Sequence, residues 1–190
     1  MDIILASASP RRKELLAYLG TNFRVLIPMT DETLLPDEKP IDYCLRVSLD
    51  KACIIADANP DSAVIAADTI VVIKERILGK PESISEAREF LNLLGGQIHE
   101  VYTGYSIICR TRNIVKSRAV KSLVEFNHMS ALEIEWYIAS GEPMDKAGAY
   151  ALQGIASAFI KGITGSYTNV IGLPLSELYS DMKALDILIS

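Results

Sequence analysis

Residues 63–73, AVIAADTIVVI, are the most hydrophobic run of the chain and constrain its fold more than any other stretch. Their length and their β-branched side chains predict a central strand that is buried on both faces. Asp68 and Thr69 interrupt the apolar run, and an ionised carboxylate there is costly unless it is paired, hydrogen-bonded or bound to metal. Either the strand ends at Ala67 and Asp68 lies in a turn, or Asp68 is a functional acid. We favour the functional acid.

The pattern on either side of this run alternates between strands and helices. The expected strands are 3–6, 23–28, a hairpin of 96–111 and 114–126, and one strand near 155–163. The expected helices begin at Pro10, at 41, at Ser83, at Ser130 and at Pro174, and residues 76–83 read as a turn that carries Lys80. Because the hairpin strands are antiparallel, we expect a mixed sheet in an α/β fold. No linker divides the chain, so residues 1–190 are expected to form one domain.

The first predicted helix has an unusual start. Ser9 is a good N-cap and Pro10 fits the first helical position. Arg11, Arg12 and Lys13 then place three cations in the first turn, where the helix dipole favours anions. A bound anion would compensate for this arrangement, held by backbone N–H groups, serine hydroxyls and arginine side chains. The alternative is a solvated basic helix start, and we favour the phosphate site.

The helix expected at 41–58 leaves one lysine in an ambiguous place. Its apolar stripe consists of Leu45, Leu49, Ala52, Cys53 and Ala56. Lys51 lies off that stripe, and it is expected in solvent unless its face borders a cleft.

Composition excludes several classes of protein. The net charge of −5 argues against a surface that coats a nucleic-acid polymer. The three cysteines are too few and too scattered for a disulfide framework or a CxxC metal site, which fits a reduced, cytoplasmic setting. The first residues read as a strand, with no basic segment and no long apolar segment, so we expect no secretion signal. No apolar run reaches the roughly 20 residues of a membrane helix, so no membrane association is expected.

The polar residues that stand out suit phosphate chemistry. These candidates are Ser7, Ser9, Arg11, Arg12, Glu32, Lys51, Asp68 and Lys80. Hydroxyls, arginines and lysines bind phosphate oxygens. Glu32 and Asp68 could hold Mg²⁺, or one of them could deprotonate an attacking water. The set fits hydrolysis of a phosphoanhydride better than acyl transfer.

The sequence lacks the motifs of two other enzyme classes, the GxSxG hydrolases and the P-loop enzymes. His99 and His128 have no nucleophile context such as GxSxG, so we interpret both as structural residues. The chain has no GxxxxGK[ST] sequence, which argues against a P-loop enzyme in spite of Gly79-Lys80.

Taken together, these stretches resemble the Maf nucleotide pyrophosphatases over nearly the whole chain. The matching pieces are SASPRRKELL (7–16), Glu32, Lys51-Ala52, AADTIV (66–71), LGKP (78–81), GQIHEVYTG (96–104), SGEPMDKAGAYALQG (140–154) and GSYTNVIGLP (165–174). The resemblance implies a mixed α/β fold of the Maf/Ham1 or inosine triphosphate pyrophosphatase kind. A long central sheet is flanked by helices, with two intimate lobes around a cleft. It also implies a cytoplasmic protein that is often a homodimer.

The resemblance implies an activity and a role for each matching residue. The activity is hydrolysis of a nucleoside triphosphate to the monophosphate and pyrophosphate, with Mg²⁺ or Mn²⁺ as cofactor. Asp68 would be the proton acceptor, and Glu32 would assist at the metal, which Glu32 and Asp68 would bind. The phosphate-binding residues would be Ser7, Ser9, Arg11, Arg12, Lys51 and Lys80. Whether Asp68 acts as base, as metal ligand or as both is left open, because both roles need the same carboxylate.

Three further positions match the family branch that prefers dTTP and UTP, namely Arg11, Thr69 and Gln153. The Gln153 amide offers a donor and an acceptor side by side, as does the uracil edge with O4 and N3–H. Cytosine reverses this edge, although an amide can flip. The alternative is that Gln153 hydrogen-bonds only within its loop.

A second hypothesis comes from the link of the family name to septum formation. In that interpretation the chain is a nucleotide-responsive binding protein in cell division. The intact set of acids argues against it, because a protein that only binds needs no base.

Overall fold

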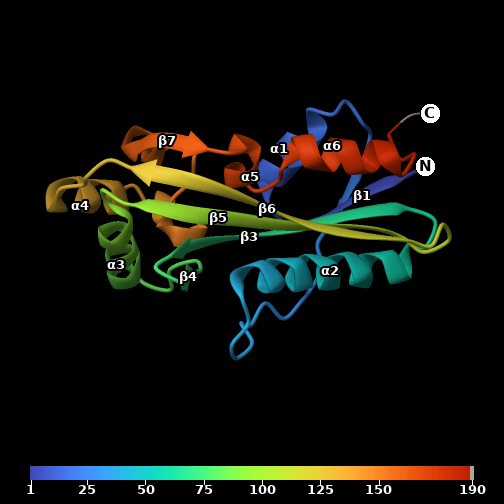
Figure 1. The fold of residues 1–190 in the computed structure, drawn as a ribbon, viewed down its shortest axis with the longest axis horizontal. Coiled ribbons are helices and arrows are strands. Elements are labelled where there is room, and N and C mark those ends of the chain that lie inside the picture. The colour runs from blue at the N-terminus through green and yellow to red at the C-terminus, as the bar shows by residue number, and fades with distance from the viewer. Residues whose placement is uncertain (189–190) are drawn as a thin grey trace. The chain divides into compact units, whose positions relative to one another are not determined.

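The computed structural model describes residues 1–188 and shows a mixed α/β fold built on one seven-stranded sheet (Figure 1). The strands are Ile3–Ala6 (β1), Arg24–Leu26 (β2), Ala63–Ile73 (β3), Arg76–Leu78 (β4), Ile98–Cys109 (β5), Ile114–Phe126 (β6) and Ile160–Thr164 (β7). The α-helices are Pro10–Ala17 (α1), Pro40–Ala58 (α2), Ile84–Leu94 (α3), Ala131–Ala139 (α4), Tyr167–Ile171 (α5) and Leu175–Ala184 (α6). Short 3-10 helices are Glu142–Asp145 (η1), Ala147–Ala149 (η2) and Ile155–Phe159 (η3).

The strands follow the order β2-β1-β3-β5-β6-β7, and β4 pairs with β3. β1 is parallel to β2 and β3, whereas β4 is antiparallel to β3 and β7 is antiparallel to β6. The sheet is therefore mixed, as predicted. β3 runs without a break through Asp68, and every position of it except Thr69 is buried. The interpretation that places Asp68 in a turn is wrong.

Contacts within the chain divide it into two compact units. Unit 1 comprises Met1–Asp68, Thr103–Val120 and the part that begins at Gly172, and unit 2 comprises Thr69–Tyr102 and Lys121–Ile171. Strands β3, β5 and β6 contribute residues to both units.

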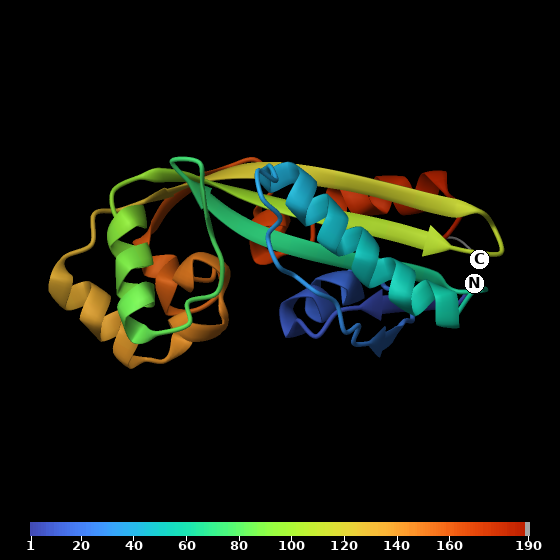
Figure 2. The same ribbon diagram turned by 90° about the horizontal axis from the view of Figure 1, so that it is seen from below.

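The core of unit 1 forms where α2 packs on the sheet. Ala52, Ile55 and Ala56 of α2 meet side chains of β1, β3 and β5, among them Val64 and Ala66. Within this unit α2 covers one face of the strands and α6 covers the other (Figures 1 and 2). The face of β3 that bears Val64 and Ala66 is therefore the face beneath α2.

Unit 2 has a core of its own. Side chains of β3 and the two helices α3 and α4 contribute to it, including Val71, Phe90, Leu91 and Tyr137. α3 and α4 pack against each other in this unit (Figure 2).

Local signals fix several helix ends as the sequence predicts. The Ser9 hydroxyl caps α1 by accepting from Arg12 N, and Pro10 occupies the first helical position. Ser130 and Glu133 form a complete capping box at the start of α4.

Several short elements differ from the prediction. Residues 76–78 of the predicted turn form β4, and the strand expected near 155–163 is η3 followed by β7. α5 was not predicted. Within residues 1–188, no helix is both long enough and apolar enough to cross a membrane.

Candidate active site

The turn between β1 and α1 presents polar groups at a helix start. The Ser7 hydroxyl is buried and accepts from Ser9 N at 3.2 Å and from Arg12 Nη1 at 3.4 Å. The Ser9 hydroxyl accepts from Arg12 N at 3.4 Å. Hydroxyls and an N-terminal helix turn thus converge beside one guanidinium, which is the arrangement that anions favour.

Arg12 connects this turn to other parts of unit 1. Its Nε donates to the carbonyl oxygen of Gly172 at 2.9 Å. Burial lowers the pKa of the Arg12 guanidinium, while the negative charges of Asp68 and Glu32 raise it. An arginine guanidinium stays protonated in proteins, so Arg12 acts on the two carboxylates as a cation.

Lys51 lies between those two carboxylates. Its Nζ is 2.8 Å from Asp68 Oδ1 and 2.8 Å from Glu32 Oε1. Side chains alternate along a strand, so Asp68 shares the face of β3 that bears Val64 and Ala66 beneath α2. The sequence predicts Lys51 in solvent unless its face borders a cleft, and solvation does not hold: the side chain is buried, because the strand closes that face of α2 and Asp68 pairs with the ammonium there.

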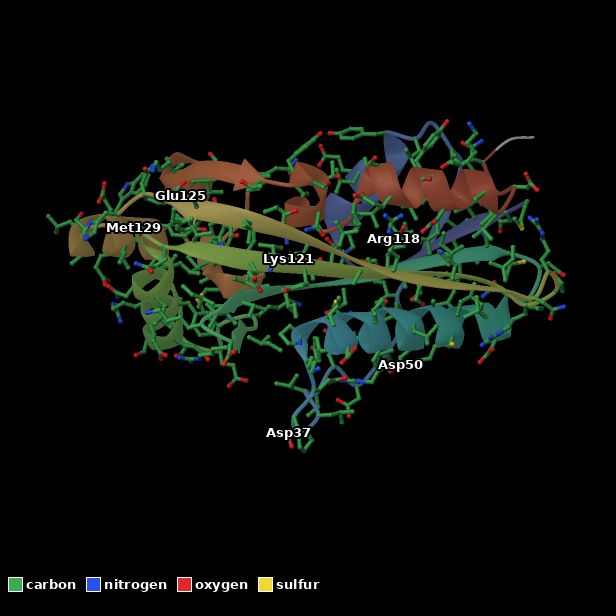
Figure 3. All side chains as sticks on the ribbon, in the orientation of Figure 1. Asp37, Asp50, Arg118, Lys121, Glu125 and Met129 are labelled. Atoms are coloured by element: carbon green, nitrogen blue, oxygen red, sulfur yellow. The ribbon has the colours of Figure 1, made fainter. Side chains whose placement is uncertain are left out.

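Hydrogen bonds to the backbone hold the loop that carries Glu32, in addition to the ion pair between Glu32 and Lys51. Tyr43 of α2 donates its hydroxyl proton to the Glu32 carbonyl at 2.8 Å, and Arg46 donates to the Thr33 carbonyl at 3.0 Å. Glu38 in turn accepts from Arg46 Nε at 2.6 Å. Figure 3 shows Asp37 at the tip of this loop between β2 and α2, and Asp50 on the side of α2 turned away from the strands. The loop that carries Glu32 is thus anchored to α2, the helix of Lys51.

Burial and the negative charges of the two acids raise the pKa values of two neighbouring side chains. Burial, followed by Asp68 and Glu32, raises the pKa of Tyr43 to about 12. Burial, followed by Asp68, raises the pKa of Cys44 to about 12. Both groups are therefore neutral near pH 7, and Tyr43 acts as a donor rather than as a base.

Glu32 and Asp68 are the residues that could hold a metal ion. Within residues 1–188, no group of three or more His, Cys, Asp or Glu side chains is placed to bind a metal. Mg²⁺ commonly needs one or two protein carboxylates, with water and substrate phosphates as its other ligands. Two carboxylates that already share one cationic group, the Lys51 ammonium, fit an ion that arrives with a polyphosphate.

Arg11 follows Pro10 at the start of α1 in unit 1 and is partly exposed, and the remaining predicted site residues belong to unit 2. Thr69 follows Asp68 in β3 and therefore points to the opposite face of the strand. Lys80 is exposed in the segment after β4, where Gly79 O accepts from Gly148 N at 3.0 Å. Gln153 is also exposed, and among residues 1–188 its side chain makes no hydrogen bond. The alternative role for Gln153, a bond within its own loop, therefore finds no support.

The sequence did not reveal the residues that support the candidate site by anchoring the loop of Glu32. Tyr43 and Arg46 carry no recognisable motif, and their partners are backbone carbonyls of a loop. No local pattern predicts such contacts, because any donor of suitable length could make them. His99 lies in the core of unit 2 and His128 is exposed, and neither contacts the acids.

Comparison with known proteins identifies the family. The Maf-like protein family matches residues 2–185. The dTTP/UTP pyrophosphatase of Syntrophus aciditrophicus (strain SB) is 50% identical over 181 residues, which are 95% of this chain and 88% of that protein. A dTTP/UTP pyrophosphatase of Bacillus cereus is 44% identical over 185 residues, which are 97% of this chain and 96% of that protein.

Solved structures resemble the fold at much lower sequence identity. The Ham1 protein of Staphylococcus aureus has a TM-score of 0.58 at 13% identity and covers 97% of this chain and 100% of its own. A HAM1 protein from Coxiella burnetii has a TM-score of 0.54 at 14% identity, with 97% and 99% covered. These likenesses confirm the expected fold class, and the family match and the relatives together establish that this chain belongs to the Maf family.

Proposed function

We propose that this protein hydrolyses nucleoside triphosphates between the α and β phosphates, releasing the nucleoside monophosphate and pyrophosphate, with dTTP and UTP preferred. The observation that carries the proposal is the buried Asp68 carboxylate, which is paired with Lys51 in a group that also contains Glu32, Arg12 and Ser7. The relatives named dTTP/UTP pyrophosphatase support the same activity.

The residues divide between binding and proton transfer. Phosphate binding is assigned to Arg11, Arg12, Lys51, Lys80 and the hydroxyls of Ser7 and Ser9. Asp68 accepts a proton from water as the water oxygen bonds to the α phosphorus. The bond from that phosphorus to the bridging oxygen breaks, and pyrophosphate leaves with the electron pair.

A divalent cation, Mg²⁺ or Mn²⁺, completes this proposal. Glu32 and Asp68 would hold it, and the ion would neutralise charge on the phosphates. Because Lys51 contacts both carboxylates, its ammonium must share them with the ion or turn toward the phosphates.

Base preference is assigned to Arg11, Thr69 and Gln153. The exposed Gln153 amide can pair with O4 and N3–H of uracil or thymine. Purines lack that edge, and a polar site that is left unpaired can reject a base by up to about 10⁴-fold.

The family resemblance also supports a proposal for the compartment and the assembly of the protein. The protein is proposed to act in the cytoplasm on a nucleotide substrate, and a homodimer is its expected assembly. The hypothesis of a nucleotide-responsive septum protein is not favoured, since the relatives carry the names of enzymes.

The first prediction concerns the substrate and the bond that is cleaved. Purified protein is mixed with dTTP, UTP, CTP, ATP or GTP in ¹⁸O-water, with Mg²⁺, with Mn²⁺ or with a chelator, and the products are separated. We expect higher kcat/KM for dTTP and UTP, the label in the monophosphate, and loss of turnover with the chelator.

Asp68→Asn should lower kcat by about 10²–10⁴-fold, because it removes the proposed proton acceptor. The matched control is Asp57→Asn, which alters an exposed acid paired with Arg110 and should keep the parent rate.

Three results would contradict parts of this proposal. Label in free orthophosphate, with the diphosphate as co-product, would indicate a γ-phosphatase. Purine triphosphates hydrolysed as well as UTP would remove the base preference. A folded Asp68→Asn protein with near-parent turnover would remove Asp68 as the proton acceptor.

A further inference from the structure

The backbone that follows Gln153 is tied to a single carboxylate in unit 2. Glu142 lies at the start of η1, and its side chain reaches the first residues of η3. Glu142 Oε2 accepts from Ile155 N at 2.9 Å, and Oε1 accepts from Ala156 N at 3.3 Å. One side chain thus satisfies two backbone donors within three residues of Gln153.

The same carboxylate is anchored to helix α4. The Tyr137 hydroxyl donates to Glu142 Oε1 at 3.0 Å. Tyr137 is fully buried, and burial together with the charge of Glu142 raises the pKa of its phenol, so the phenol stays protonated. A charge-assisted hydrogen bond from a buried donor fixes the carboxylate more firmly than an exposed contact would. The loop after Gln153 is therefore tied to helix α4 through Glu142.

Gly154 shows how closely the chain approaches this anchor. Its φ of +123° is a conformation that side chains rarely adopt, and a Cβ there would lie 2.6 Å from Glu142 Oε2. The chain passes over the carboxylate at a position where glycine fits. Gln153, the residue immediately before it, projects an exposed side chain that has no hydrogen bond among residues 1–188. The backbone is held tightly while the amide is left available.

We propose that Glu142 is a positioning residue for base selection, because it fixes the backbone from which Gln153 presents its amide to the pyrimidine edge. This inference rests on the proposed function, since it assumes that Gln153 reads the base. In this role Glu142 acts through Gln153 and touches neither substrate nor reacting atoms. A hydrogen-bonding pair selects a base only while its geometry is kept, and a misplacement of about 1 Å can cost up to about 10²-fold.

A purely structural role for Glu142 makes a different prediction. If the carboxylate only closes the loop, its loss lowers stability and affects all substrates alike. If it positions Gln153, its loss lowers kcat/KM for UTP and leaves that for ATP unchanged. The ratio of the two values separates these roles, because the folded fraction cancels from the ratio.

The experiment measures kcat/KM for UTP and ATP in the parent and in Glu142→Gln. The glutamine keeps the shape, but its amide NH₂ faces a backbone N–H in either orientation, so the contact to Ile155 N or to Ala156 N is lost. We expect the UTP/ATP ratio to fall by about 10-fold or more, through a higher KM for UTP. The double variant Glu142→Gln/Gln153→Ala should show the ratio of Gln153→Ala alone, since both changes remove the same interaction.

Two further variants complete the design. Glu133→Gln is the matched control, because it removes another carboxylate of unit 2 that accepts from Ser130 N at 2.8 Å and should leave the ratio unchanged. Tyr137→Phe removes only the phenol donor and should lower the ratio in the same direction by less. If Glu142→Gln does not fold, Tyr137→Phe decides the question alone.

The outcomes separate this inference from the proposed function. A parent without preference for UTP, or a ratio unaffected by Gln153→Ala, would overturn base reading by Gln153 and this inference with it. A parent preference that is lost in Gln153→Ala but retained in Glu142→Gln and in Tyr137→Phe would overturn this inference alone.

Discussion

At the scale of residues, Lys51 has two acidic partners in unequal environments. The Asp68 side chain is 10% exposed and the Glu32 side chain is 48% exposed. Removing one partner of a buried ion pair leaves an uncompensated charge, so Lys51→Met should lower the free energy of unfolding by about 3–5 kcal/mol. Asp68→Asn should cost less, because Lys51 keeps Glu32, and Glu32→Gln should cost below about 1 kcal/mol. Urea unfolding of the three variants at pH 7 measures these differences.

The double variant Lys51→Met/Asp68→Leu serves as the control for this prediction. Because it removes both charges, it should recover part of the loss seen in Lys51→Met. Equal losses in Lys51→Met and Glu32→Gln would show that the burial of Asp68 does not decide the cost.

Most of the candidate site residues could be named from the sequence, but their pairings could not. Ser9, Arg12 and Asp68 stand out because each breaks or satisfies a local rule. Lys51 breaks none, and its partner Asp68 lies 17 positions away on another element. The contact from Arg12 to Gly172 spans 160 positions. Such contacts depend on how α2 and the chain after α5 pack, which no local pattern records.

At the scale of elements, the close approach of β5 to α2 sets where Lys51 lies. A Cβ on Gly104 of β5 would lie 2.3 Å from the backbone oxygen of Cys44 in α2. Gly104→Ala must therefore push α2 away from the strands, and overpacking of this kind costs about 1–3 kcal/mol. We expect a lower Tm and, because Lys51 moves with α2, a lower kcat. Thermal unfolding and steady-state kinetics measure the two effects.

Gly162→Ala is the matched control for this element. Gly162 lies in β7, where a Cβ would meet no atom within 4 Å. This variant should keep the parent Tm and kcat. Similar losses in both variants would mean that any alanine in a strand is harmful, rather than the contact with α2.

Long elements could be predicted from the sequence, and short ones could not. The run 63–73 is long, apolar and rich in β-branched residues, and the helix of residues 40–58 has a clear apolar stripe, so both can be identified from local sequence. β4 has three residues and pairs with β3 through a two-residue turn of Lys74 and Glu75, both at positive φ. Two-residue turns with positive φ usually contain Asn or Gly, and this turn contains neither. Tertiary pairing overrides the local preference at this turn.

At the scale of the whole molecule, one buried histidine links stability to pH. His99 lies in the core of unit 2, where its Nε2 is 2.7 Å from the Tyr150 hydroxyl. Burial lowers its pKa to about 4, whereas an unfolded histidine has a pKa of about 6.5. Between these values the unfolded chain binds a proton that the folded chain does not, so stability falls as the pH falls. The expected slope approaches about 1.4 kcal/mol per pH unit, measured by urea unfolding between pH 7 and 5.

The second histidine provides the control. His99→Gln should flatten the pH dependence between pH 6.5 and 5, while His128→Gln, which alters an exposed side chain, should keep the parent slope. Parallel curves for the parent and His99→Gln would rule out His99 as the source of acid sensitivity.

The division of the chain into two units also bears on how the protein is made. Unit 1 is assembled from three separate stretches, and its last stretch begins at Gly172 and includes α6 with the buried Leu178 and Met182. Ribosomes add roughly 5–20 residues per second, and domains usually fold as they emerge. Here the unit that contains Asp68 and Lys51 still lacks a core helix when residues 1–171, which include all of unit 2, have been synthesised. The strands of this unit must therefore avoid wrong pairing in the nascent chain until α6 has been synthesised.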